Sequence, residues 1–334
     1  MTENNNRTAF GLELAGRIRQ ETDFLMITHI FPDGDAIGSL TAFHRLMVSL
    51  GKNSQMVCNS ELPYQYSFLP GYGEIKCSGR IEDIDKKKYT CIVLDCADEE
   101  RTGMDLGSLR AAGSFIINID HHKSNVLFGD MNIVDSQKAA TAEMLFDFMD
   151  KFFGPIMDYE TAMGIYVGIL TDTGRFQYSN TTSHVHYIAG KLLEYGIYPA
   201  EVYGHIYEND PLGRFRLIQA VFNRIEFIEP LGLIYSYVLE KDFRRLKIPY
   251  YSQDGIIELL RSARGASVTA LIKEIGDHSY RISLRTSDRN IDLSRIASGF
   301  GGGGHRTASA YKDTGRLKQV IERLIQAVER ESGR

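Results

Sequence analysis

Short apolar runs and longer stretches of helical periodicity alternate through the first half of the chain. Four apolar runs predict strands at 24–27, 53–58, 89–95 and 114–120. Hydrophobic residues recur at helical spacing in three stretches, 37–50, 143–152 and 162–170. Apolar strands that alternate with helices predict an α/β fold, in which helices cover both faces of a doubly wound, mostly parallel sheet.

The second half of the chain has a different pattern. Residues 182–224 predict connecting helices, and within them the aromatic and acidic stretch 198–211 predicts an interdomain linker or hinge. From residue 225 onward a two-residue periodicity predicts two β-hairpins, and helical patterns follow each of them. The hairpins are expected at 225–239 and 268–284, and the helices at 255–264 and 317–330. We therefore expect a smaller, separate α+β domain with a mixed sheet.

Length and composition limit the protein class. With 334 residues, we expect a first domain over 1–185, a helical connector over 186–224 and a second domain over 225–334. No apolar segment is long enough for a signal peptide or a membrane span, and the four cysteines lack CxxC spacing, so we expect a cytoplasmic protein. A net charge of −5 argues against broad, non-specific binding to duplex nucleic acid, but it is compatible with a small anion held by local arginines.

Acidic and imidazole side chains follow three of the predicted strands and one predicted helix. In chain order they are His29, Asp33, Asp35, Asp95, Asp120, His121, His122 and Asp172. Because the carboxyl ends of parallel strands meet at one edge of a sheet, we expect these groups to gather there. Taken singly, an Asp is often a helix N-cap, and a histidine pair is often a buried hydrogen-bonding pair. Taken together they predict a polynuclear metal site, since neighbouring carboxylates repel each other unless a cation lies between them.

A run of four glycines, 301–304, precedes His305 and Arg306 in the second domain. Glycines let backbone amides approach an anion without obstruction by side chains, and the two following residues add a donor and a fixed charge. The alternative is a flexible linker, but linkers usually carry Ser and other polar residues on both sides. We therefore predict anion or nucleotide contact here.

Three arginines are weaker candidates for the same task. Arg285, at the end of a predicted strand, is a candidate phosphate contact. For Arg264 and Arg101 a surface role is the simpler interpretation.

These motifs together resemble those of the DHH phosphoesterase superfamily. The chain carries His29-x-x-x-Asp33-x-Asp35, Asp95 after a strand, the triplet Asp120-His121-His122, and Asp172 between two threonines. The run 301–305 resembles the glycine-glycine-glycine-histidine motif of the DHH-associated C-terminal domain. The resemblance covers nearly the whole chain, and its length and domain order are similar to those of the nanoRNase/pAp-phosphatase branch.

The resemblance implies a first, catalytic domain that binds two divalent ions, most simply Mn²⁺, with Mg²⁺ or Co²⁺ as alternatives. One ion would be held by His29, Asp33 and Asp95, with Asp95 shared. The other would be held by Asp35, Asp95, His121 and Asp172. Asp120 would orient the histidine pair, and His122 would either support the metal ligands or contact the phosphate; the choice of His121 or His122 as the direct ligand stays open. The second domain would contact the nucleotide through Gly302, Gly303, Gly304 and His305.

The same resemblance implies hydrolysis of short oligoribonucleotides to mononucleotides and of 3′-phosphoadenosine 5′-phosphate (pAp) to AMP. The nearest alternative is a phosphodiesterase for linear or cyclic dinucleotides such as pApA. An inorganic pyrophosphatase ranks low, because its C-terminal domain has a Lys/Arg-rich signature in place of the glycine-histidine run. A non-catalytic nucleotide or RNA-binding module is the alternative from another class. A homodimer is compatible with the sequence, although no pattern in the sequence supports it.

Overall fold

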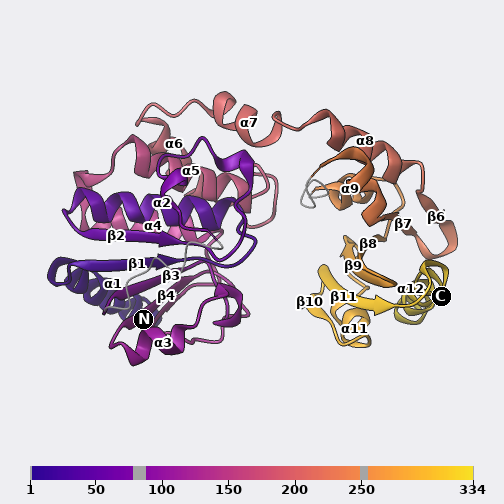
Figure 1. Cartoon of the computed structure of the whole chain (residues 1–334), viewed down its shortest axis with the longest axis horizontal. Coiled ribbons are helices and arrows are strands. Elements are labelled where there is room, and N and C mark those ends of the chain that lie inside the picture. Colours follow the sequence, from indigo (N-terminus) through magenta and orange to yellow (C-terminus); the bar gives the residue numbers. More distant parts are fainter. Residues whose placement is uncertain (1, 78–87, 249–254, 334) are drawn as a thin grey trace. The chain divides into compact units, whose positions relative to one another are not determined.

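The computed structural model describes residues 2–77, 88–248 and 255–333, and the chain divides into two compact units, Met1–Asn209 and Asp210–Arg334. Each unit has its own sheet and its own hydrophobic core (Figure 1). The predicted fold class is confirmed: the first unit is α/β with a parallel sheet, and the second is α+β with a mixed sheet. None of the described helices is both long and apolar enough to cross a membrane.

The sheet of the first unit has five parallel strands in the order β2-β1-β3-β4-β5. Its strands are β1 (Asp23–Ile27), β2 (Asn53–Val57), β3 (Thr90–Leu94), β4 (Phe115–Asp120) and β5 (Met131–Val134). Its helices are α1 (Thr2–Gln20), α2 (Gly34–Ser49), α3 (Leu106–Ala111), α4 (Thr141–Phe152), α5 (Tyr159–Asp172), α6 (Ser183–Leu193) and α7 (Pro199–Tyr207). The four predicted strands are confirmed, and β5 is an additional edge strand. The stretch 198–211, predicted as a linker or hinge, is largely the helix α7.

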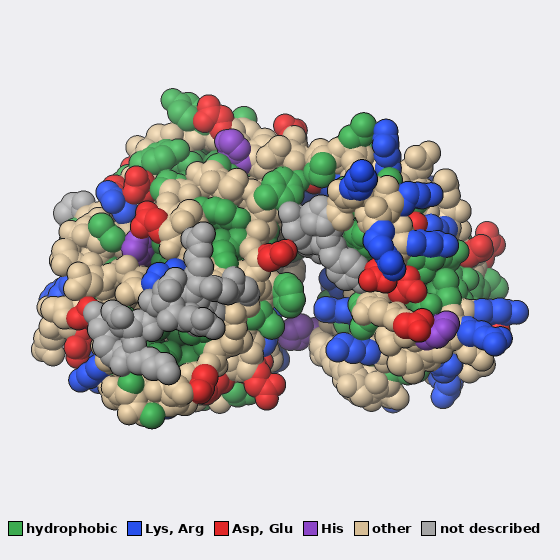
Figure 2. Space-filling view, in the orientation of Figure 1, with side chains coloured by type: hydrophobic (Ala, Val, Ile, Leu, Met, Phe, Trp, Pro, Cys, Tyr) green, Lys and Arg blue, Asp and Glu red, His purple; other side chains and the backbone are tan. Residues whose placement is uncertain are grey.

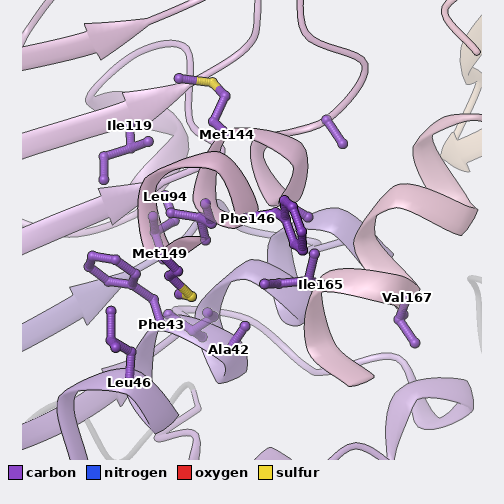
Figure 3. Packing of buried hydrophobic residues seen from close by; sticks show 14 of the residues in the cluster. Ala42, Phe43, Leu46, Leu94, Ile119, Met144, Phe146, Met149, Ile165 and Val167 are labelled. Atoms are coloured by element: carbon purple, nitrogen blue, oxygen red, sulfur yellow. The ribbon is translucent and has the colours of Figure 1, made fainter. Parts of the chain in front are cut away.

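The larger core of the first unit lies between one face of the sheet and helices α2, α4 and α5. Figure 3 shows Phe43 and Leu46 of α2, Met149 of α4 and Ile165 of α5 among these buried side chains. A smaller core on the other face includes Leu106 of α3, so both faces are covered. Alternating buried side chains on strands such as β3 supply both cores, which explains why these strands are apolar throughout.

Helices α2 and α5 approach each other very closely, and glycines make this approach possible. A Cβ atom on Gly38 would lie 2.3 Å from the carbonyl oxygen of Gly164, and a Cβ on Gly164 would lie 2.6 Å from that of Gly38. The contact aligns the first turn of α2 with the last turn of α5. As a result, Asp35 and Asp172 come together although they are far apart in the sequence.

The second unit has a six-stranded sheet in the order β10-β11-β9-β8-β7-β6, in which only β7 and β8 are parallel among the described strands. The strands are β6 (Glu226–Ile228), β7 (Leu233–Val238), β8 (Val268–Gly276), β9 (Ser279–Thr286), β10 (Gly303–His305) and β11 (Ala308–Thr314). The helices are α8 (Leu212–Phe222), α9 (Glu240–Leu246), α10 (Ile256–Arg261), α11 (Leu293–Ser298) and α12 (Leu317–Ser332). Both predicted hairpins are confirmed, as β6–β7 and β8–β9.

The two faces of this second sheet are covered differently. Helices α11 and α12 cover one face and form a core that includes Leu293 and Leu324. Helices α8, α9 and α10 form a smaller core on the other face, around Val238 and Leu271 of β7 and β8. The part of that face that β9, β11 and β10 form carries polar and small residues instead.

Candidate active site

The site of the first unit lies beyond the carboxyl ends of three neighbouring strands. Strands β1, β3 and β4 pair directly in the sheet, and His29, Asp95 and His121 follow them. The start of α2 contributes two aspartates and the end of α5 contributes Asp172. All eight residues predicted at the strand and helix ends of this unit are therefore brought to one edge of the sheet.

The two aspartates at the start of α2 have different environments. Asp33 is the N-cap: its Oδ1 accepts the backbone N–H groups of Asp35 and Ala36, both at 3.1 Å, and its side chain is otherwise exposed. Asp35 is fully buried, and its two oxygens accept the N–H groups of Thr141 at 2.6 Å and Ala142 at 2.9 Å. The capping role weighed from the sequence is thus real for Asp33, whereas Asp35 is held by the N-terminus of α4.

Asp95 lies in the centre of the site, buried and with a left-handed φ of 56°. Its Oδ2 lies 3.6 Å from Nε2 of His29, and its Oδ1 lies 3.6 Å from Nε2 of His121. The hydroxyl of Thr141 donates to the same Oδ1 at 3.0 Å. The two oxygens of one carboxylate therefore face two different groups of side chains.

The two histidines of the triplet have different partners. His121 points its Nε2 toward Asp172, at 3.1 Å from Oδ2, and its Nδ1 toward the carbonyl oxygen of Lys138, at 3.3 Å. His122 has its Nδ1 at 2.7 Å from Oδ1 of Asp120, and its side chain is about 30% exposed. The amide of Asn125 donates to the other oxygen of Asp120 at 2.6 Å, so this carboxylate is fixed on both sides.

The side chains of the site form two groups that could each hold a cation. His29, Asp33 and Asp95 form one group, and Asp35, His121 and Asp172 form the other, with the ligand atoms in each group within 4.8 Å of one another. His122 is within the same distance of Asp95 and His121. Imidazole and carboxylate donors in this mixture suit Mn²⁺ and related divalent ions.

The charges of the site favour the binding of cations. Burial, and then the charges of Asp95 and Asp172, raise the pKa of Asp35 well above its usual range. Burial also raises the pKa of Asp172 to about 6. Burial lowers the pKa of His121, but the hydrogen bond with Asp172 and the carboxylates around it outweigh burial and raise that pKa to about 10. Without a metal, the site therefore compensates its excess of negative charge by holding protons.

One further cluster was missed in the sequence. Glu143, Asp147 and His184 also have ligand atoms within 4.8 Å of one another. However, the ammonium of Lys138 already bonds Glu143 at 3.0 Å and Asp147 at 2.5 Å. We interpret this cluster as a structural ion network. It is connected to the site, because the carbonyl oxygen of Lys138 lies 3.3 Å from Nδ1 of His121.

In the second unit the glycine run forms a turn and the edge strand β10, so the flexible-linker alternative is wrong. A Cβ on Gly302 would lie 2.4 Å from the carbonyl oxygen of Ala310, and Gly304 has a φ of 137°. These two glycines therefore serve the packing of β10 on β11. Gly303, in contrast, faces open space and His305 is exposed.

The three candidate arginines lie in separate places. Arg285 is on β9, and the strand register aligns it with His305 through Ala308 of β11. Arg264 is exposed beyond the end of α10. Arg101 belongs to the first unit, where it is exposed and its carbonyl oxygen accepts the N–H of Ile30 at 2.7 Å.

Comparison with known proteins agrees with this architecture. The DHH family, N-terminal domain, matches residues 23–169, and the DHHA1 domain matches residues 233–332. A Thermus thermophilus protein named bifunctional oligoribonuclease and PAP phosphatase NrnA is 34% identical over 313 residues, which cover 93% of this chain and 90% of that protein. The Bacillus subtilis protein of the same name is 24% identical, with 93% and 97% covered.

The fold also matches a solved structure. An exopolyphosphatase-related protein from Bacteroides fragilis superposes with a TM-score of 0.88 at 23% identity, covering 97% of this chain and 96% of that one. The two domain matches follow each other in the same order as the two units, and the full-length relative has more than 30% identity. The chain therefore belongs to the DHH phosphoesterases, as an enzyme with a DHH domain followed by a DHHA1 domain.

Proposed function

We propose that this phosphoesterase hydrolyses short oligoribonucleotides to mononucleotides and pAp to AMP, with two divalent metal ions in its first unit. The observation that carries the proposal is the orientation of Asp95, whose two oxygens face two separate groups of ligand atoms. The names of the full-length relatives from Thermus thermophilus and Bacillus subtilis support the substrate class. The cytoplasmic location and the homodimer stay predictions from the sequence.

In this proposal one ion would be held by His29, Asp33 and Asp95, and the other by Asp35, His121 and Asp172. Asp95 would serve the second ion as well, since its Oδ1 lies 3.6 Å from Nε2 of His121. The donor set fits: it combines imidazoles with carboxylates, and its members are placed where further positive charge is favourable. Mn²⁺ is the proposed metal because mixed imidazole and carboxylate sites suit it better than Mg²⁺. Two such ions would supply a hydrolytic nucleophile at neutral pH and would neutralise charge on the phosphate.

The partners of the histidines favour His121 as the direct ligand. Its Nε2 is within 3.9 Å of oxygens of Asp35, Asp95 and Asp172. His122 is proposed as the residue that contacts the substrate phosphate, because Asp120 fixes its Nδ1 while the side chain stays partly exposed. Asp120 is then a positioning residue, which holds the ring and favours its protonated form.

The proposal is tested by turnover with Mn²⁺ on four substrates: pAp, pApA, RNA of two to five nucleotides and RNA of 20 nucleotides. We expect kcat/KM for pAp and the short RNAs to exceed that for the long RNA by at least about tenfold, since a long RNA must also order the many nucleotides that follow its terminal one when that nucleotide enters the site. Turnover confined to pApA would establish the dinucleotide phosphodiesterase instead. Binding of all four without turnover would establish the non-catalytic alternative.

Thr141 supports both ligand groups and provides a further prediction. Its hydroxyl donates to Asp95 while its backbone N–H donates to Asp35, so Thr141→Val removes only the first contact. We expect the affinity for Mn²⁺ to fall about 10- to 100-fold, as is usual when a partner of a ligand is lost. The measurement is kcat/KM as a function of Mn²⁺ concentration.

A matched control is available at the start of α5. The hydroxyl and N–H of Thr161 make the same kind of contacts to Asp158, away from the site. Thr161→Val is expected to reduce thermal stability without changing the dependence of kcat/KM on Mn²⁺ concentration. Thr141→Ser, which keeps a hydroxyl, is expected to show the wild-type dependence on Mn²⁺. If Thr141→Val and Thr161→Val have the same metal dependence, Thr141 has no positioning role.

A further inference from the structure

Three cationic side chains lie side by side across three neighbouring strands of the second sheet. In the strand register Arg281 of β9 is opposite Lys273 of β8 and opposite Lys312 of β11. Residues that are directly opposite in antiparallel strands point to the same face, so these three cations, here called the basic row, share one face. Like charges in this arrangement destabilise a sheet, and an anion bound over them would remove that cost.

Two members of the basic row have no anionic partner in the protein. Arg281 and Lys312 are exposed, and neither side chain makes a hydrogen bond or an ion pair with any residue that the structure describes. Arg285, two pairs further along β9, differs because its Nε lies 3.4 Å from a carboxylate oxygen of Glu258. The positive charges of Arg281 and Lys312 are therefore available to a ligand.

A hollow of about 330 Å³ adjoins the basic row. It is lined by Lys273, Arg281 and Arg285 together with Ser283, and by Ile257 and Glu258 on the side of α10. This volume is near the lower end of that of small-molecule sites, which suits a sugar and its phosphate better than a larger group. Three of its eight lining residues are cationic and one, Glu258, is acidic, so the net charge of the hollow favours an anion.

The same sheet face carries a second set of cationic and donor side chains. Arg285 and His305 lie in one row, aligned through Ala308, and the basic row crosses β9 four residues away, or about 13 Å. Between them lies a row of small residues, Gly303, Ala310 and Ser283. Because small side chains separate the two cationic rows, an extended polyanion can pass over both rows, whereas a single small anion would reach only one.

The distribution of charge between the two units supports a polyanion. Residues 210–334 contain 21 Lys and Arg and 15 Asp and Glu, a net charge of +6. Residues 1–209 contain 17 Lys and Arg and 28 Asp and Glu, a net charge of −11. Lys and Arg side chains are correspondingly frequent on the visible face of the second unit in Figure 2. The overall charge of −5 conceals a basic unit that attracts phosphates.

We propose that the basic row is a second phosphate subsite, which binds the backbone of an oligoribonucleotide beyond the nucleotide contacted by Arg285 and His305. Lys273, Arg281 and Lys312 contact phosphates only and read no base, so the subsite favours an oligonucleotide of a few residues over a mononucleotide or dinucleotide, whatever its sequence. The inference rests on the proposed function for the identity of the substrate. Its consequence is that RNA of several nucleotides gains affinity that pAp and dinucleotides do not.

The test compares the double variant Arg281→Gln/Lys312→Gln with the wild-type chain. Binding of a 5′-phosphorylated RNA pentamer with a 3′-fluorophore is measured by anisotropy in EDTA, so that no turnover occurs, and a labelled dinucleotide is measured in parallel. We expect the variant to bind the pentamer about tenfold more weakly, and the salt dependence to lose about 0.7 in slope for each phosphate contact removed. Dinucleotide binding and pAp hydrolysis are expected to stay at wild-type levels.

The matched control is Lys318→Gln/Arg330→Gln, which removes the same two charges from exposed positions on α12, the helix that covers the opposite face. It is expected to bind the pentamer like the wild type. Equal pentamer affinity in the two double variants would overturn the subsite, as would an equal loss for dinucleotide and pentamer. A wild-type chain that binds the pentamer through the basic row but hydrolyses no RNA would contradict the proposed function and leave the subsite intact.

Discussion

Asp95→Asn is expected to reduce kcat/KM for pAp and short RNA by at least about 10³-fold, because the variant replaces the one carboxylate shared by both proposed metal sites. The amide has a single acceptor oxygen, so it cannot face both His29 and His121 as the carboxylate does. Asparagine is chosen over alanine because Asp95 has a φ of 56°, a conformation that Asn tolerates well. The measurement is steady-state hydrolysis with saturating Mn²⁺.

The fold of this variant is expected to survive. In the metal-free protein the charge of Asp95 raises the pKa of Asp35; burial opposes the ionisation of Asp95 itself, but the hydrogen bond with His29 and the charge of His121 outweigh burial and hold its pKa well below the usual range. The variant therefore loses repulsion and attraction together, and the two effects offset each other in part. A circular dichroism spectrum like that of the wild type and a Tm within a few degrees of the wild-type value would show this. Glu100→Gln, which removes an exposed carboxylate from a nearby turn, serves as the charge-matched control and should keep full activity. Wild-type turnover by Asp95→Asn would rule out a bridging role.

Removal of the metal is expected to abolish activity and to lower the thermal stability of the protein. A ligand that binds only the folded state at about 100 times its dissociation constant adds about 2.7 kcal/mol. For a unit of this size that corresponds to an increase of about 5–10 °C in Tm when Mn²⁺ is restored. Differential scanning fluorimetry of the chelated and the reloaded protein measures this increase directly, without any assay of turnover.

The stabilisation by metal is expected to increase with pH. The raised pKa of His121 stabilises the metal-free protein fully below about pH 6.5, and this contribution is lost as the pH rises toward 10. A metal ion needs His121 in its neutral form, so its binding strengthens over the same interval. The difference in Tm between loaded and metal-free protein should therefore be larger at pH 8.5 than at pH 6.5.

The ion network around Lys138 provides the control for this experiment. His184→Gln alters the separate cluster of Glu143, Asp147 and His184, in which the ammonium group of Lys138 already bonds Asp147. The increase in Tm on addition of Mn²⁺ should be the same in this variant as in the wild type. An increase that disappears with His184→Gln, or that shrinks between pH 6.5 and 8.5, would contradict the assignment of the metal to the strand-end site.

The strand-end residues could be predicted because a parallel sheet brings its carboxyl ends together whatever the details of the loops. Asp95 and His121 are examples: each follows an apolar run, and β3 and β4 are neighbours. The supporting contacts could not be predicted. Thr141 reaches Asp35 and Asp95 only because α4 begins against α2, and no local pattern in the sequence encodes that contact.

Strand β5 was missed because its local signal is weak. It has four residues at the edge of the sheet, and only Met131 is buried, so it lacks a long apolar run. Helix α7 lies within 182–224, where connecting helices were predicted, and its place inside the predicted linker 198–211 shows that much of this stretch is helical. The basic row was invisible for another reason: Lys273, Arg281 and Lys312 are separated in the sequence and meet only through strand register.

The double role of Asp33 has a consequence for large-scale mutagenesis. Its carboxylate caps α2 through two backbone N–H groups and also stands beside His29 and Asp95. Loss of an N-cap usually costs about 1 kcal/mol, so a survey that scores cellular abundance would register substitutions at Asp33 as folding defects. Substitutions at His122, whose side chain is about 30% exposed, are expected to cost less stability and to fail mainly a growth selection that demands catalysis. The pair of surveys would therefore separate residues of the site that also hold the fold together from those that serve the chemistry alone.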